Sequence, residues 1–150
     1  MIAVLQRVSS ASVSIEGNTH GKISQGLLIL LGIEQVDTVE DVDWLTKKIT
    51  AMRIFSDEEG KMNLSCEDIN GNYLVISQFT LHASTKKGNR PSFIEAARPE
   101  VAIPLYESFI DTLMSITGKD IQKGQFGADM KVSLINDGPV TIVINSRDRK

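Results

Sequence analysis

Apolar residues recur at strand spacing over much of this chain and at helical spacing over two segments. Residues 2–4 and 11–15 alternate between apolar and polar side chains, which predicts two strands. Residues 16–18 (EGN) are typical of a turn between strands. The continuous apolar run from Leu27 to Leu31 predicts a strand that is buried on both faces.

Two longer segments carry apolar residues on one helical face. The first predicts a helix over residues 39–53, capped by Asp37 or Thr38. The second predicts a helix from about Glu100 to Thr117, which Gly118 ends. The two apolar faces are Val42, Leu45, Ile49 and Met52, and then Ala102, Leu105, Tyr106, Phe109, Leu113 and Ile116.

The remaining apolar segments are short and predict further strands. Residues 73–81 predict a strand that leaves the core, and residues 85–98 predict a long loop. Residues 130–135 and 140–144 predict two strands joined by a turn at 136–139. Strands outnumber helices without alternating with them, so we expect a single α+β domain: a curved, largely antiparallel sheet or open barrel with two main helices packed on it.

Composition and charge narrow the classes of partner. The 150 residues carry a net charge of −3, which argues against a protein that grips many nucleic-acid phosphates but not against one that holds a few nucleotides at one RNA end. Lys86, Lys87, Arg90 and Arg98 form a local basic cluster, which charge alone favours as a solvated loop. No apolar run approaches the roughly 20 residues that a membrane helix needs, and we expect no membrane partner.

The N-terminal segment has neither a basic start nor a small-residue cleavage site, so we expect no signal peptide. A single cysteine, Cys66, fits a reducing cytosol, and a cytoplasmic location is expected. Acidic neighbours disfavour a thiolate at Cys66 and therefore a nucleophilic role.

Residues suited to most cofactor and triad chemistries are scarce. The two histidines and one cysteine have no metal-ligand spacing, and no phosphate-binding glycine motif follows a strand, so we expect no metal and no cofactor. A Ser-His-Asp triad would have to use His20 or His82. His82 lies two residues from Thr80 and could pair with it, although a solvent-facing histidine at a strand end is the favoured interpretation.

Two segments combine chemical groups that can form a site. Ser77 to Thr80 place two hydroxyls, an amide and an aromatic ring where an apolar strand ends, and a Phe79 face can stack on a base. A strand edge with Phe79 in the core is the equal alternative. Gly138-Pro139 follows Asn136-Asp137; it suits a hairpin turn, and its peptide bond can be cis or trans.

At these two segments the chain resembles the D-aminoacyl-tRNA deacylase family, also named D-tyrosyl-tRNA deacylase. The resemblance runs from Met1 to about Ile144 with its motifs in the expected order, and together these motifs are specific. The motifs are SQFTL (77–81), NDGPVT (136–141), QRVSSASV (6–13), GLLILLGI (26–33), RIFSDEEGKMNL (53–64), RPSF (90–93) and ADMKVSLINDGPVT (128–141).

The resemblance implies a homodimer with two-fold symmetry and active sites at the subunit interface. It implies that Gly138-Pro139 is cis and reaches into the partner's pocket, where its carbonyls face the amino acid and exclude an L side chain. Arg7 corresponds to an arginine that fixes this element, and Met130 to a residue of the pocket wall. Ser77, Gln78, Phe79 and Thr80 are implied to line the pocket for the terminal adenosine.

The implied reaction is hydrolysis of the ester between a D-amino acid and the end of a tRNA, without a cofactor. Thr80 and Gln78 are the residues expected to serve catalysis, through backbone groups or by positioning. Backbone N–H groups can stabilise the oxyanion, and the terminal 2′-hydroxyl of the RNA can assist the attacking water. Steric exclusion of L side chains would also admit glycyl-tRNA.

Two rival interpretations remain at this point. In one, Thr80 is a protein nucleophile with His82 or Lys86 as its base. In the other, the protein is a non-catalytic dimeric binding module, in which Gly138-Pro139 is only a turn and Ser77 to Thr80 form an edge strand.

Overall fold

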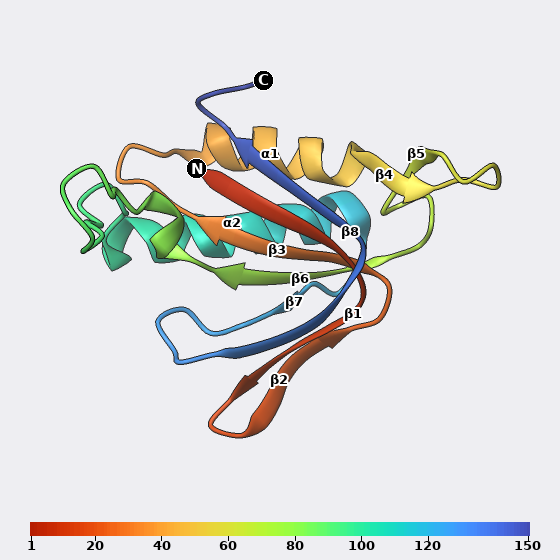
Figure 1. Cartoon of the computed structure of the whole chain (residues 1–150), viewed down its shortest axis with the longest axis horizontal. Coiled ribbons are helices and arrows are strands. Elements are labelled where there is room, and N and C mark those ends of the chain that lie inside the picture. Colours follow the sequence, from red (N-terminus) through yellow and green to blue (C-terminus); the bar gives the residue numbers. More distant parts are fainter.

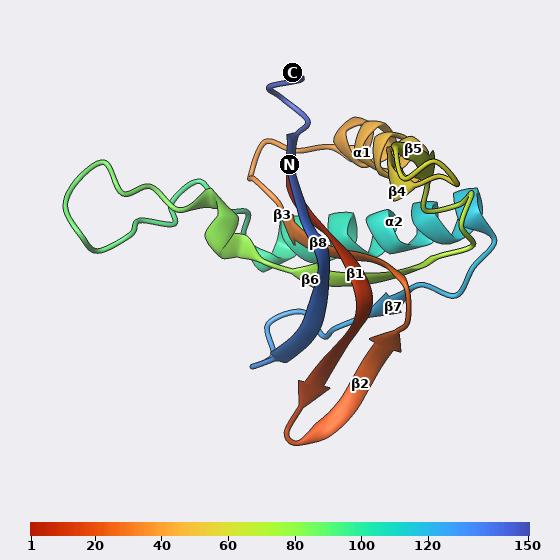
Figure 2. The same ribbon diagram turned by 45° about the vertical axis from the view of Figure 1, so that its right-hand side comes forward.

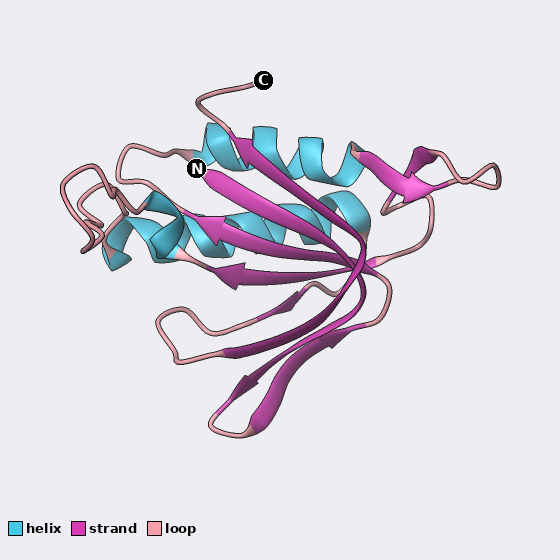
Figure 3. Ribbon diagram, in the orientation of Figure 1, coloured by secondary structure: helices cyan, strands magenta, loops and turns pink.

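Two helices pack against one face of a strongly curved, nearly closed sheet in the computed structural model, which describes all 150 residues (Figure 1). Figure 3 shows how the strands fan out below the helix layer. The predicted fold class is confirmed. The elements are β1 (Ile2–Ile15), β2 (Asn18–Ile23), β3 (Gly26–Gly32), α1 (Val39–Ala51), β4 (Arg53–Ser56), β5 (Met62–Ser65), β6 (Asn72–Ser77), the 3-10 helix η1 (Phe79–His82), α2 (Pro99–Thr117), β7 (Gln122–Lys123) and β8 (Lys131–Asn145).

The central strand is β1, which replaces the two strands predicted from residues 2–4 and 11–15. Its first half pairs with β3 and its second half with β2, both antiparallel. On its other side, β8 pairs with it from Ile2 to Ser14. The polar middle of β1 therefore stays extended, because it has a strand partner although it has little apolar alternation. The predicted division of β1 was wrong for this reason.

The sheet continues from β3 to β6 and then to β7, and both of these pairings are parallel. The order β2-β1-β3-β6-β7 bends until β2 approaches β7, where the backbone N–H of Lys22 donates to the Gln122 side chain at 3.3 Å. The strand β8 has β1 as its one strand partner, so its other edge is free. The hairpin β4–β5 and the short β7 were not predicted.

A bulge in β8 replaces the hairpin turn predicted at residues 136–139. Gln6 pairs with Thr141 and Val8 pairs with Asn136, so residues 137–140 all lie opposite Arg7. Both halves of β8 run antiparallel to the same strand, and the chain does not reverse. The Gly138-Pro139 peptide bond within the bulge is cis. The Asp-Gly pair suggested a reversal that pairing with β1 prevents.

The helices have nearly the predicted bounds. Thr38 caps α1 by accepting a hydrogen bond from the backbone N–H of Glu40, and Asp41 completes a capping box. Gly118 ends α2 in the left-handed conformation, at φ 66°. The predicted buried face of α2 is confirmed except at Ile116, which is exposed in the last turn. No helix has the length and apolar character needed to span a membrane.

Two apolar clusters hold these layers together. The larger contains 24 buried residues and lies between the helices and the sheet. The smaller contains seven buried residues and fills the inside of the curved sheet around β1, β2 and β6. Met130 and Val132 pack against this smaller cluster, so the segment leading into β8 is fixed beside the end of β6.

Candidate functional site

The strand β6 ends at Ser77, four residues earlier than the predicted strand 73–81. Ser77 and Leu31 form the last rung that β6 shares with β3. The next backbone N–H, of Gln78, still donates to the Leu31 carbonyl at 2.8 Å, and the chain then turns into η1. Ser77 to Thr80 therefore form a strand-to-helix corner and not an edge strand.

A pocket opens at this corner, between the end of β6, the first turn of α2 and the segment before β8. Its volume is about 260 Å³, and ten of its thirteen lining residues are hydrophobic. Four of the predicted site residues line it together: Ser77, Gln78, Phe79 and Met130. An apolar pocket with a few polar groups at one wall is the usual form of a small-ligand site. Sequence analysis missed Phe126 and Ala128, which also line it and lack a distinctive motif.

Phe79 is a wall of the pocket mouth and not a core residue. Its side chain is 53% exposed. It meets the ring of Phe93 edge to face, with the centroids 5.2 Å apart. One face of an aromatic ring at a pocket mouth can stack on a nucleic-acid base. The alternative that placed Phe79 in the core was wrong, because the chain turns before Phe79 can enter the sheet.

Thr80 is exposed, and its hydroxyl accepts a hydrogen bond from the Gln78 side-chain amide at 2.6 Å. The backbone N–H groups of Phe79 and Thr80 donate to no carbonyl or side chain of the chain. Such free donors are usual in the first turn of a helix. The corner therefore offers two backbone donors beside the pocket and no base hydrogen-bonded to Thr80.

His82 is buried, contrary to the favoured prediction that it faces solvent. Its side chain is 6% exposed, and its Nε2 atom has no hydrogen-bond partner. It packs beside Gly32, where an added Cβ would lie 3.2 Å from the imidazole ring. The turn into η1 directs His82 inward. Neither His82 nor Lys86 hydrogen-bonds to Thr80, so neither base considered for a threonine nucleophile is in place to take its proton.

Arg7 holds the β8 bulge. Its Nε donates to the carbonyl of Asp137 at 2.9 Å, and its Nη1 donates to the carbonyl of Ile54 at 2.7 Å. The side chain of Asp137 adds a longer ion pair at 3.7 Å. Arg7 is buried, and a Cβ added at Gly138 would lie 2.8 Å from its Nη2. The guanidinium therefore fixes the bulge through its backbone and leaves room for glycine alone.

Gly138 and Pro139 are exposed and do not line the pocket of their own chain. Arg7, opposite the bulge, pairs with Leu27, whereas the pocket begins four residues further along β3, at Leu31. Four residues of a strand span about 13 Å. The structure thus brings the Ser77–Phe79 corner and Met130 together and places Gly138-Pro139 apart from them.

The geometry supports neither a cysteine nucleophile nor a metal site. Burial, with a smaller contribution from the neighbouring Glu67 carboxylate, raises the pKa of the Cys66 thiol to about 11. A thiol with that pKa is a poor nucleophile near neutral pH. No three His, Cys, Asp or Glu side chains gather closely enough to hold a metal ion.

Comparison with known proteins identifies close relatives along the whole chain. The sequence pattern described as D-Tyr-tRNA(Tyr) deacylase matches residues 4–145. Proteins named D-aminoacyl-tRNA deacylase from Akkermansia muciniphila and Flavobacterium johnsoniae are 63% and 60% identical, over all of both chains. A solved structure described as c-Myc DNA Unwinding Element Binding Protein is 40% identical, with a TM-score of 0.92 over 97% of this chain and 98% of that chain. Another, described as a probable eukaryotic D-amino acid tRNA deacylase, is 16% identical and shares the fold, with a TM-score of 0.83 over 95% of this chain and 97% of that chain.

The two hydrogen bonds of Arg7 give a testable prediction. We expect Arg7→Lys to destabilise the fold by about 1–3 kcal/mol, because one ammonium cannot serve two carbonyls on different segments and leaves a buried acceptor without a donor. Urea denaturation measures this. Arg53→Lys is the matched control, since the Arg53 side chain is exposed and takes part in none of the side-chain hydrogen bonds or ion pairs of the chain. Equal stability of the two variants would contradict the role of Arg7 in holding the bulge.

Proposed function

This chain belongs to the D-Tyr-tRNA(Tyr) deacylase family, and we propose that two copies of it build the site where a D-amino acid is removed from tRNA. Its relatives carry the name D-aminoacyl-tRNA deacylase, and the chain is a hydrolase of aminoacyl-tRNA esters with tRNA as its substrate. The observation that carries the proposed site is the pocket at Ser77–Phe79, with an aromatic ring at its mouth and two free N–H groups beside it.

In the proposed complex, the terminal adenosine lies against the Ser77–Phe79 corner. Phe79 presents an exposed ring for the base, and Gln78 and Ser77 offer polar groups for the ribose. The scissile ester then lies near the free N–H groups of Phe79 and Thr80. Met130 closes the far wall of the pocket. In this proposal, the bulge of a second chain supplies the group that distinguishes a D from an L amino acid.

A homodimer accounts for the exposed features of β8. This long strand has one free edge, and Leu134, Ile135 and Val143 expose apolar side chains along it. Exposed edges and apolar patches of this kind are usually covered in the working protein. Two-fold pairing is the commonest closed assembly, and pairing through β8 would bring each bulge to the partner's surface. The bulge of each subunit would then complete the pocket of the other.

We expect light scattering to give the mass of a dimer at concentrations where the enzyme is active. Ile135→Asp, at a position that is 62% exposed, should yield monomers and lower activity by at least about tenfold, because a charge would enter the apolar interface. Val39→Asp is the control: Val39 is 58% exposed at the start of α1, where an acidic residue is favourable. A wild-type monomer with full activity would refute the shared site.

Selectivity in this proposal comes from backbone shape. The bulge is fixed by Arg7 through the Asp137 carbonyl, and in this proposal the backbone at Gly138 and Pro139 faces the amino acid rather than a side chain. A rigid backbone can exclude an L side chain, which projects in the opposite sense from a D side chain. Glycine has no side chain and should enter, so glycyl-tRNA should also be hydrolysed.

Gly138→Ala tests the role of this backbone. Gly138 has φ 128°, and its added Cβ would press against Arg7, so the bulge must shift. We expect hydrolysis of D-tyrosyl-tRNA to fall at least about tenfold, or L-tyrosyl-tRNA to become a substrate, since about 1.4 kcal/mol of misfit suffices. Gly17→Ala is the control: Gly17 also has a positive φ, of 79°, but open space around it. Unchanged rate and selectivity in Gly138→Ala dimers would mean that the bulge does not select.

Catalysis in this proposal needs no protein base. The free N–H groups of Phe79 and Thr80 can stabilise the developing oxyanion, and the terminal 2′-hydroxyl of the RNA assists the attacking water. The Thr80 hydroxyl already accepts a hydrogen bond from Gln78 and has no basic partner. Thr80 therefore acts through its backbone position.

Thr80→Ala should accordingly keep most activity, within about threefold. A D-aminoacyl-tRNA that ends in 2′-deoxyadenosine, charged on its 3′-oxygen, should lose at least about a hundredfold, the scale of a missing proton-transfer group. Single-turnover kinetics measure both. A threonyl ester trapped by rapid quench and detected by mass spectrometry would instead show that Thr80 is a nucleophile.

A further inference from the structure

We propose that the basic loop of residues 83–98 binds phosphates of the RNA strand that precedes the terminal nucleoside. This inference rests on the proposed function, because it extends the same substrate beyond the pocket. From charge alone, sequence analysis favoured a solvated loop as the explanation of this basic cluster. Its place in the fold supports a binding role.

The loop differs in charge from the rest of the chain. It holds four basic residues, Lys86, Lys87, Arg90 and Arg98, and one acidic residue, Glu95, which gives a net charge of +3. Since the whole chain carries −3, the remaining residues sum to −6. None of the four basic side chains forms an ion pair with a carboxylate: the ion pairs of the chain involve other cations. An unpaired cationic loop on an anionic protein attracts and orients an RNA backbone.

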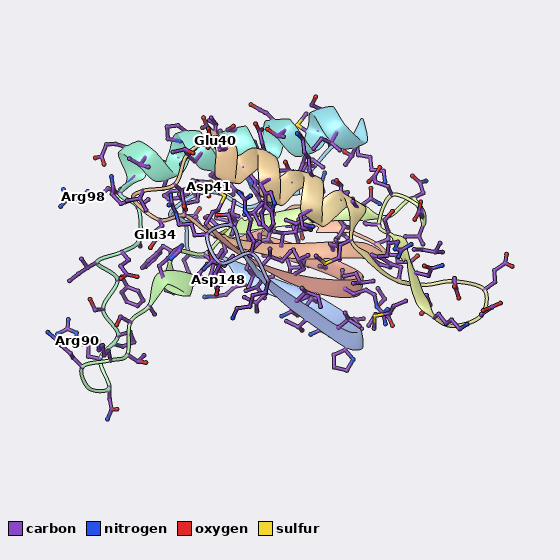
Figure 4. The ribbon with its side chains drawn as sticks, turned by 90° about the horizontal axis from the view of Figure 1, so that it is seen from above. Glu34, Glu40, Asp41, Arg90, Arg98 and Asp148 are labelled. Carbon is purple, nitrogen blue, oxygen red and sulfur yellow. The ribbon has the colours of Figure 1, made fainter.

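The loop has a defined shape. Ser84 and Ser92 exchange two backbone hydrogen bonds, of 2.8 and 2.9 Å, so its base is a closed hairpin. Figure 2 shows this loop projecting far from the sheet and helices, on one side of the molecule. Figure 4 places Arg90 near its outer end and Arg98 at its return to α2, both directed away from the core. The cations are therefore exposed to solvent on a loop whose base is held by backbone hydrogen bonds.

A cleft along the loop carries the proposed contacts. Its volume is about 270 Å³, and Lys86, Lys87, Arg90, Ser84 and Ser92 line it. Ammonium, guanidinium and hydroxyl groups are the usual ligands of phosphate oxygens. Glu95 also lines the cleft and opposes an anion there. The three cations outnumber it, and the cleft remains positive.

An aromatic contact links the segment that lines the cleft to the mouth of the pocket. Phe93 follows Ser92 directly, and its ring touches Phe79, which lines the pocket mouth. A strand whose last base lies at Phe79 can pass over Phe93 and bring its preceding phosphates to the cleft. Aromatic rings beside a basic groove form the common arrangement for single-stranded RNA.

The experiment compares three D-tyrosyl substrates: adenosine alone, a short single-stranded RNA ending in C-C-A, and full tRNA. For Lys86→Gln/Lys87→Gln/Arg90→Gln we expect kcat/KM to fall on both RNAs, through KM, while D-tyrosyl-adenosine is hydrolysed as by the wild type. Each lost phosphate contact should make the slope of log kcat/KM against log salt concentration shallower by about 0.7. The loss of three contacts should therefore change this slope by about two on both RNAs. A fourfold rise in salt concentration would then lower kcat/KM about 16-fold more for the wild type than for the variant. Glu95→Gln should lower KM on the same RNAs.

Lys47→Gln/Lys48→Gln/Arg53→Gln is the matched control. It removes the same charge from α1 and β4, where these residues are exposed and unpaired with carboxylates, and it should leave the salt slopes unchanged. Equal salt slopes in the loop variant and the wild type would refute the proposal. If the variant lowered kcat/KM on tRNA but not on the short RNA, the loop would not bind the strand that precedes the terminal nucleoside. Loss of D-tyrosyl-adenosine hydrolysis in the loop variant would point to a role for Lys86 at the ester. Wild-type enzyme without activity on any substrate would instead refute the proposed function.

Discussion

The guanidinium of Arg7 holds four residues of β8 out of the ladder, opposite a single residue of β1. One of its nitrogens donates to the carbonyl of Asp137 and another to the carbonyl of Ile54, which joins the bulge to β4, the strand after α1. A buried guanidinium that donates to two backbone carbonyls is costly to displace. The bulge is therefore a fixed part of the sheet, and its exposed glycine and proline are presented in one arrangement.

The rigid bulge and the pocket divide the proposed work between two subunits. In this proposal, the pocket at the end of β6 binds the terminal nucleoside, and its free N–H groups stabilise charge on the ester. The bulge would supply a fixed backbone surface for selection. If discrimination depends on backbone carbonyls and catalysis on backbone N–H groups, neither function needs the side chains of a catalytic triad.

Sequence analysis predicted the fold class, both helices, the end of the second at Gly118, and four of the residues that line the pocket. Its errors came from interactions between distant segments. The pairing of β8 with β1 makes a bulge of Asp137-Gly138, which local propensity assigns to a hairpin, and keeps the polar middle of β1 extended. The end of the β3–β6 ladder turns the chain at Gln78 and buries His82, which was expected to face solvent at the end of a strand. Phe126 and Ala128 could not be found, because apolar loop residues carry no pattern.

A subunit-complementation assay tests the shared site most directly. Gly138→Ala alters the bulge, and Ala128→Phe would fill the pocket that Ala128 lines. If each site combines the pocket of one subunit with the bulge of the other, a mixed dimer holds one intact site. Random exchange at equal amounts of two variants that have each lost at least about tenfold of their activity on D-tyrosyl-tRNA should then restore about a quarter of wild-type activity, since half of the dimers are mixed and half of their sites are intact. Mixtures that stay inactive after subunit exchange, verified by mass spectrometry, would show that each chain works with its own bulge and would contradict the account.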